Sequence, residues 1–252
     1  MSNPYNLTPD QILQKLPYEH RGRSQHLEIG IIRELAKNLK INNKFFFEIG
    51  WANGGCNMTT DLFDDGWTGI GIDVYDAPHP SIKLPNSFKY RKLFVDPDNL
   101  SIAFNGVPKD FEFFSLDIDS YDFVISEWLL KNKFRPKFVC LEINPRFGPI
   151  VEASFPWKKR IKKLYNKQGI YGVSIAKYKK LWESYGYKLF TYDSSLTNVF
   201  FYHVESLNDL SQYKVHTLAD FPIKVDVNRD YIIEHGRWAE DLDLIYVPYT
   251  PS

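Results

Sequence analysis

The segment KFFFEIGWANGGCNMTTDLFDDGWTGIGID, residues 44–73, decides the fold. Residues 44–49 are mostly apolar over the length of a strand, a glycine-rich turn follows, and residues 57–65 predict a short helix that the next glycine ends. Residues 67–72 form a second apolar run that leads to Asp73. A carboxylate at that point of a doubly wound sheet accepts hydrogen bonds from a ribose diol, so the segment predicts a nucleotide-cofactor site.

The residues of the turn indicate which cofactor fits. A dinucleotide fingerprint needs G-x-G-x-x-G, but here Ala52 replaces the middle glycine and the bulky Trp51 precedes it. Glu48 adds a carboxylate that would repel a phosphate and attract an ammonium group. We therefore expect S-adenosylmethionine, which has a ribose and an ammonium group but no phosphate, with its adenine near Asp96. The residues expected to bind it are Glu48, Gly50, Asn53, Gly54, Asn57, Asp73, Asp96 and Asp117.

A purely structural interpretation of the turn stays open, because any parallel sheet has a glycine turn after its first strand. The position of Asp73 favours the cofactor, since the acidic residue of such sites falls roughly 20 residues after the turn.

The composition is that of a globular enzyme. With 252 residues, 44% of them hydrophobic, the chain can bury one core. Lys plus Arg and Asp plus Glu both total 31, so no net charge attracts nucleic acid, and no such partner is expected. The start resembles no signal peptide and no apolar run reaches the roughly 20 residues of a membrane span, so we expect a cytoplasmic protein. The two cysteines, Cys56 and Cys140, are expected to be reduced.

Strands and helices continue to alternate after Asp73. Further strands are expected over residues 88–95, 111–116 and 137–145. Two more, residues 187–192 and 198–203, are separated by a turn too short for a helix, so they pair antiparallel. The helices expected between these strands lie around residues 124–129 and from a cap at Ser174 to Gly186. An α/β fold with a mostly parallel seven-stranded sheet that ends in an antiparallel hairpin is the Rossmann-like class I methyltransferase layout.

Five stretches of this pattern resemble motifs of one family. They are Phe47–Gly50, Gly66–Asp73, Ser115–Asp122, Leu141–Pro149 and Tyr171–Ser174. Together they resemble the FkbM-like S-adenosylmethionine-dependent methyltransferases, over about residues 20–204. The resemblance implies O-methylation of a sugar hydroxyl on a glycan or nucleotide-sugar. The expected domains are a helical lid at 1–43, a methyltransferase domain at 44–204 and an extension at 205–252.

Polar residues, most of them acidic, lie at the carboxyl ends of the fourth and fifth expected strands. Asp117 and Asp119 leave the fourth, and Glu142 and Asn144 leave the fifth, so their oxygens should meet at one edge of the sheet. Oxygen ligands suit Mg²⁺ or Mn²⁺, and the expected metal ligands are Asp117, Glu142 and Asn144. Asp117 or Asp119 could instead act as a metal-free base with a raised pKa. In the simplest alternative, Asp119 and Asp122 only cap the next helix.

Other features allow either a functional or a purely structural interpretation. His79 is a further candidate base, or only a loop residue. The lysine-rich residues 157–167 could hold a phosphate, a charged glycan or nucleic acid, or form a solvated helix. Asp117-Ile118-Asp119 also resembles the D-x-D of metal-dependent glycosyltransferases, which is the alternative enzyme class. A non-catalytic binding protein on a methyltransferase scaffold is the third possibility. The sequence leaves the oligomeric state open.

Overall fold

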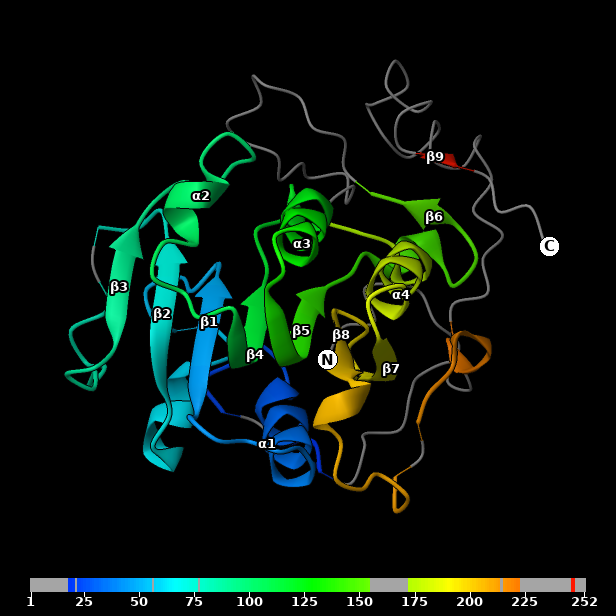
Figure 1. The fold of residues 1–252 in the computed structure, drawn as a ribbon, viewed down its shortest axis with the longest axis horizontal. Helices are drawn as coiled ribbons and strands as arrows, with labels where there is room; N and C mark the ends of the chain where they lie inside the picture. The colour runs from blue at the N-terminus through cyan, green and yellow to red at the C-terminus, as the bar shows by residue number, and fades with distance from the viewer. Residues whose placement is uncertain are drawn as a thin grey trace.

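One seven-stranded sheet organises the molecule, in the order β3-β2-β1-β4-β5-β8-β7 (Figure 1). In this computed structural model, the described residues are 18–20, 22–55, 57–76, 78–154, 172–213, 215–222 and 246–247. The strands of the sheet are β1 (Phe45–Ile49), β2 (Thr68–Asp73), β3 (Lys89–Lys92), β4 (Asp110–Leu116), β5 (Arg135–Glu142), β7 (Tyr187–Tyr192) and β8 (Asn198–His203). A separate antiparallel pair joins β6 (Glu152–Ala153) and β9 (Tyr246–Val247).

The strand directions confirm the expected Rossmann-like class I methyltransferase fold. Strands β1 to β5 are parallel, and their arrows point the same way in Figure 1. Strand β8 runs antiparallel to both β5 and β7. The carboxyl ends of β1, β2, β4 and β5 therefore lie along one edge of the sheet, where open α/β sheets bind their ligands.

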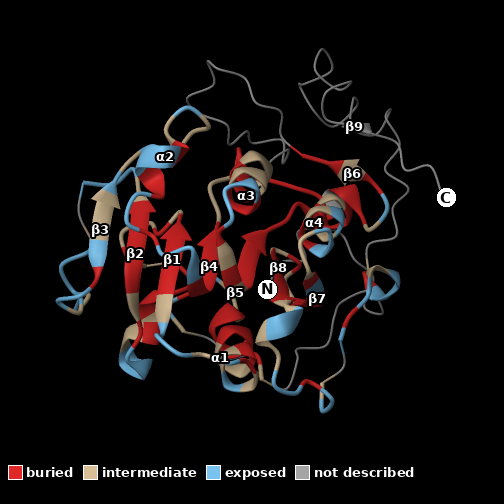
Figure 2. Ribbon diagram, in the orientation of Figure 1, coloured by how far each residue is buried: buried red, intermediate tan, exposed pale blue. Residues whose placement is uncertain are grey.

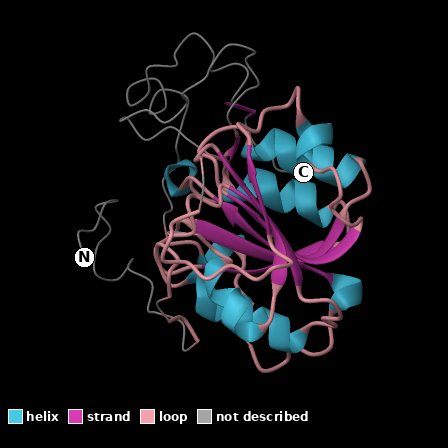
Figure 3. Cartoon of the chain, turned by 90° about the vertical axis from the view of Figure 1, so that its left-hand side faces the viewer, coloured by secondary structure: helices cyan, strands magenta, loops and turns pink. Residues whose placement is uncertain are grey.

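Helices cover both faces of the sheet (Figure 3). The α-helices are α1 (Glu28–Asn38), α2 (Leu100–Ala103), α3 (Asp122–Lys131) and α4 (Ile175–Glu183). The 3-10 helices are η2 (Thr60–Asp65), η3 (Pro145–Phe147), η4 (Val204–Ser206) and η5 (Leu218–Asp220). Helices α1 and η2 pack on one face, and α2, α3 and α4 on the other, which leaves the central strands buried (Figure 2).

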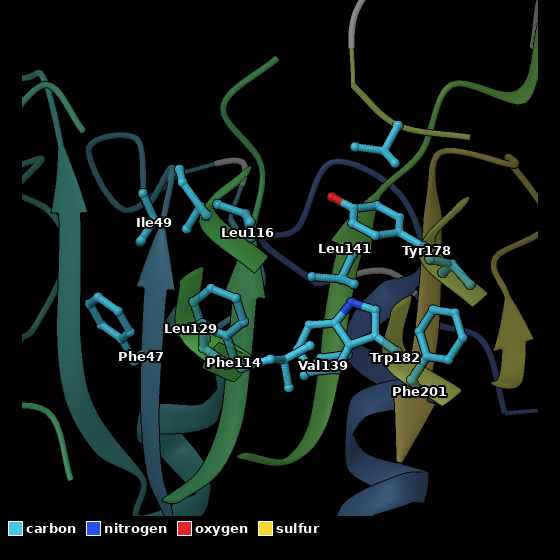
Figure 4. Close-up of a cluster of buried hydrophobic side chains, with 14 of the residues drawn as sticks. Phe47, Ile49, Phe114, Leu116, Leu129, Val139, Leu141, Tyr178, Trp182 and Phe201 are labelled. Carbon is cyan, nitrogen blue, oxygen red and sulfur yellow. The ribbon is translucent and has the colours of Figure 1, made fainter. Parts of the chain in front are cut away.

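Alternating side chains along each strand supply two hydrophobic cores. Phe47 and Leu141 face the α3 and α4 side, where Tyr178 and Trp182 of α4 complete the cluster (Figure 4). On the α1 side, the buried aromatic residues include Phe46, Phe113, Phe138 and Phe200. Successive side chains of a strand point to opposite faces of the sheet. Polar residues an even number of positions from these aromatic residues on the same strand therefore also lie on the α1 side.

Local sequence explains where most elements begin and end. The Ser174 hydroxyl accepts a hydrogen bond from the Lys177 N–H, which confirms the expected cap of α4. The helix expected over residues 57–65 is shorter, because the Asn57 side chain accepts hydrogen bonds from two backbone N–H groups and helix η2 starts only at Thr60. Gly66 ends η2 with a left-handed φ of 79°.

Several expectations fall outside the described residues: the lysine-rich segment 157–167, the state of Cys56, residues 1–17 of the expected lid, and most of the expected extension at 205–252. Within the described residues, no helix has both the length and the apolar character needed to cross a bilayer.

Candidate active site

The turn after β1 passes unusually close to the end of β4. Gly50 has a φ of 93°, and a Cβ atom added there would lie 1.7 Å from the carbonyl oxygen of Asp117. Both the left-handed backbone and the close approach require a glycine at this position. Gly50 therefore places the first residue of the acidic cluster against the turn that is expected to bind the cofactor.

Asp73 holds the same turn from the neighbouring strand. Its Oδ2 accepts a hydrogen bond from the Ala52 N–H at 2.7 Å, and its Oδ1 accepts one from the Val74 N–H at 2.6 Å. An ionised carboxylate offers about four acceptor positions, so two remain for a ribose diol. Asp73 thus occupies the expected place at the end of β2, and its contact with a ribose stays a prediction.

Glu48 is buried below the turn and bonded within the protein. Its Oε1 accepts the Met58 N–H at 2.9 Å, and its Oε2 accepts the Thr59 hydroxyl. Burial raises the pKa of Glu48 to about 7. The Ser115 hydroxyl also donates to Oε1, at 3.4 Å. These bonds fix the chain between the turn and η2, so a ligand ammonium would have to share a carboxylate that already has three donors.

The loop after β2 packs directly on the turn. The Asn53 carbonyl accepts a hydrogen bond from the His79 N–H at 2.6 Å, and a Cβ atom on Gly54 would lie 2.2 Å from Ile82 Cδ1. The His79 ring lies 2.7 Å from the Ser81 hydroxyl and is exposed. Strand β1 separates β2 from the strands that carry the acidic residues, and the role of His79 as a base stays a prediction.

Asp96 begins the connection to α2. Its Oδ1 accepts the Asp98 N–H at 2.9 Å, and its own N–H donates to the Asn99 side chain at 3.1 Å. Two large apolar side chains near the same strand ends are exposed, Val74 by 51% and Phe94 by 43%. An apolar ligand surface such as an adenine ring would cover them, which fits its expected position.

The structure brings the acidic residues of β4 and β5 together. Strand pairing matches Leu116 with Leu141, so Asp117 and Glu142 follow at the same level of the sheet. Carboxylate oxygens of Asp117, Asp119 and Glu142 lie within 4.8 Å of one another. This arrangement was expected from the sequence, and it forms a site made of oxygen atoms only.

Burial and mutual repulsion favour protonation of this cluster. Burial raises the pKa of Asp117, and the nearby charges of Asp119 and Asp122 raise it further. The pKa of Glu142 is raised in the same way, by burial and then by Asp117. A bound divalent cation would replace the shared protons and relieve this repulsion.

Asp122 organises the loop that carries the cluster. It is buried, and its two oxygens accept the N–H groups of Ile118 at 3.0 Å and Ser120 at 2.7 Å. Burial raises its pKa to about 6. The expectation that Asp119 or Asp122 caps α3 is wrong, because the cap position is Tyr121 and no side chain caps the helix. Asp122 instead holds the preceding loop, in which Asp119 has a left-handed φ of 60°.

Two observations bear on the expected metal ligands. Glu142 is only 5% exposed, and its Oε2 has no hydrogen-bond partner among the described residues. Leaving a buried carboxylate oxygen unpaired is costly, so a cation at this point would fit. Asn144 is also buried, with its N–H donating to the Val173 carbonyl at 2.9 Å, and its role as a ligand stays a prediction.

Sequence reasoning missed a second group of buried polar residues beside the cluster. The Asn198 side-chain N–H donates to Glu28 Oε1 at 3.0 Å, and the Asn198 backbone N–H donates to Asp193 Oδ1 at 3.0 Å. Burial raises the pKa of both carboxyls, that of Asp193 to about 7. One sequence signal was present. Residues 198, 200 and 202 share one face of the strand, and Asn198 is polar where Phe200 and Tyr202 are aromatic.

The strand order and the polar edge of the sheet define an α/β protein with a class I methyltransferase fold. No family model and no curated protein matches the chain. Among solved structures, it is similar to a fibrillarin/Nop5p complex, with 12% identity, 72% of this chain and 81% of that chain covered, and a TM-score of 0.43. A protein assigned as a hemolysin from Lactococcus lactis gives 19% identity, 83% and 99% coverage and a TM-score of 0.46. A similarly assigned protein from Streptococcus thermophilus has 15% sequence identity and a TM-score of 0.39. The match covers 77% of this chain and 70% of that chain.

Proposed function

We propose that the protein is an S-adenosylmethionine-dependent O-methyltransferase that modifies a sugar hydroxyl, with a divalent cation held by the acidic cluster. One observation carries the proposal: Asp117 belongs to the acidic cluster and its carbonyl packs against Gly50 of the turn. A cofactor on the turn would therefore lie next to the carboxylates. This is the arrangement that methyl transfer to a bound hydroxyl needs.

The cofactor is expected along the carboxyl ends of β1 and β2. Asp73 keeps free acceptor positions for the ribose hydroxyls, and the exposed Val74 and Phe94 offer an apolar surface for the adenine. The methionine end would extend along the turn toward Asp117. S-adenosylmethionine supplies an electrophilic methyl group when it is bound.

The acidic cluster supplies what an aliphatic hydroxyl lacks. Such a hydroxyl is a poor nucleophile, so it must be positioned in line with the methyl group and lose its proton. A carboxylate of Asp117 or Asp119 would take the proton of the acceptor hydroxyl as its oxygen bonded to the methyl carbon and the carbon–sulfur bond broke. The buried Glu142, with its unpaired Oε2, would hold the cation that lowers the pKa of the hydroxyl.

Methyl-transfer assays with a panel of sugars and nucleotide-sugars test this function, together with calorimetry of S-adenosylhomocysteine binding. Asp117→Asn and Glu142→Gln should each lower kcat by about 100-fold or more, and in Glu142→Gln cofactor affinity should change little. Chelator should reproduce the loss in the parent protein. Asp64→Asn, at an exposed carboxylate, is the matched control and should behave like the parent.

The parts of the proposal fail separately. No binding of S-adenosylhomocysteine would remove the methyltransferase assignment. Full activity in chelator would remove the cation and leave a carboxylate base. Full activity of both Asp117→Asn and Glu142→Gln would remove the cluster from the mechanism.

A further inference from the structure

Two buried oxygen atoms at the carboxyl edge of the sheet lack hydrogen-bond partners among the described residues. One is Glu142 Oε2, and the other is Asn198 Oδ1. The two residues are 5% and 1% exposed. Unpaired buried acceptors are rare, and each costs the free energy of its lost hydration. Other buried atoms of the described residues also lack partners, but these two belong to residues that pair across neighbouring strands, so one group that attracts oxygen atoms could satisfy both.

The strand register brings these two side chains close together. Glu142 of β5 pairs with Asn198 of β8. In the next pair, Ile143 with Thr197, the Ile143 N–H donates a hydrogen bond to the Thr197 carbonyl at 2.8 Å. Hydrogen-bonded and non-hydrogen-bonded pairs alternate in an antiparallel ladder. Glu142 and Asn198 are therefore a non-hydrogen-bonded pair, the type in which side chains approach more closely.

Both side chains also lie on the face of the sheet that carries Asp117. Cys140 and Phe200 pack on the α1 side, and Glu142 and Asn198 are two residues from them on the same strands. Asp117 directly follows β4, four residues after Phe113, and its N–H donates to the Ile49 carbonyl at 3.0 Å, so it continues the alternation of that strand. One row of polar residues thus crosses three neighbouring strands on one face.

The hydrogen bonds of Asn198 determine which end of its amide faces the row. Glu28 Oε1 accepts from the side-chain nitrogen of Asn198 at 3.0 Å, and a carboxylate can only accept from the nitrogen end. The backbone N–H of Asn198 is held by Asp193. With the nitrogen bonded to Glu28, the oxygen is the end that remains to be satisfied.

We propose that Asn198 Oδ1 is a further ligand of the divalent cation of the acidic cluster, and that Glu28 orients it. The ligand set would then include Asp117, Asp119, Glu142 and Asn198, contributed by the ends of three neighbouring strands. An all-oxygen set of this kind suits Mg²⁺ or Mn²⁺. The proposal rests on the cation of the proposed function. It adds Asn198, which lies at the start of β8, where the sequence has no acidic motif.

Direct Mn²⁺ binding to the full chain tests it, measured by the paramagnetic resonance signal of free Mn²⁺ and without any substrate. Asn198→Ala should weaken Mn²⁺ binding by about ten-fold or more. Asn198→Asp loses the donor to Glu28 but keeps an oxygen at the position and adds a negative charge that attracts the cation, which offsets that loss, so its Mn²⁺ affinity should equal or exceed that of the parent. Asn208→Ala, the same change at an exposed asparagine, should leave binding unchanged.

The two Asn198 variants separate ligation from a structural role. A structural role through Glu28 predicts that both variants weaken binding alike, and that result would overturn the proposal. Parent-like Mn²⁺ binding by Asn198→Ala would also overturn it, while the three-carboxylate site and the proposed function would stand. If the parent itself binds no Mn²⁺, both this proposal and the cation of the proposed function are wrong. The methyltransferase assignment is then tested separately by cofactor binding and methyl transfer. Should Asn198→Ala fail to fold, Asn198→Asp decides alone.

Discussion

Replacing Gly50 by alanine tests how the turn after β1 is held against the end of β4. The residue has a φ of 93°, and the added Cβ would lie 1.7 Å from the Asp117 carbonyl oxygen. A left-handed backbone costs a residue with a side chain roughly 1–2 kcal/mol. The collision adds an overpacking cost of about 1–3 kcal/mol, because the obstacle is backbone and must move as a unit.

We therefore expect Gly50→Ala to lower the free energy of unfolding by about 2–5 kcal/mol, measured by urea denaturation. Gly66→Ala is the matched control: its φ is 79°, but nothing lies within 4 Å of the added Cβ. It should show only the backbone cost, roughly 1–2 kcal/mol. The difference between the two variants isolates the collision.

The variant should also affect the site, because Asp117 has to move. S-adenosylhomocysteine affinity and Mn²⁺ affinity should both fall in Gly50→Ala and stay near parent values in Gly66→Ala. Equal stability losses in the two variants would refute the close packing of the turn on β4 and remove the argument that links cofactor and cluster.

Two further predictions concern buried or bonded carboxylates. Asp73→Asn should weaken S-adenosylhomocysteine binding by about 1.5–3 kcal/mol in calorimetry, the scale of a hydrogen bond to a charged group; unchanged affinity would remove the ribose from Asp73. Glu48 has a folded-state pKa of about 7, above its ordinary 4.5, so the folded protein holds a proton that the unfolded chain releases between these values. Stability should therefore fall as the pH rises through this window, by at most about 3 kcal/mol from this group, and urea midpoints of Glu48→Gln should fall less steeply. Parallel pH profiles of parent and variant would contradict the buried, protonated Glu48.

The sequence alone determined the order of strands and helices. Period-two and helical patterns act over a few neighbouring residues, so strands β7 and β8 begin and end where they were expected. The cap at Ser174 is equally local. The short helix before Gly66 was placed too early, because Asn57 bonds the backbone around it in a way that composition does not reveal.

The sequence also indicated that Asp117, Asp119 and Glu142 would meet, because parallel neighbouring strands deliver their carboxyl ends to one edge. Only the tertiary structure paired Glu142 with Asn198 and placed Glu28 beside them. The register between β5 and β8, and the burial that shifts the pKa values, depend on how distant segments pack together. No local pattern encodes those distances, so the residues around the carboxylates emerged only from the folded chain.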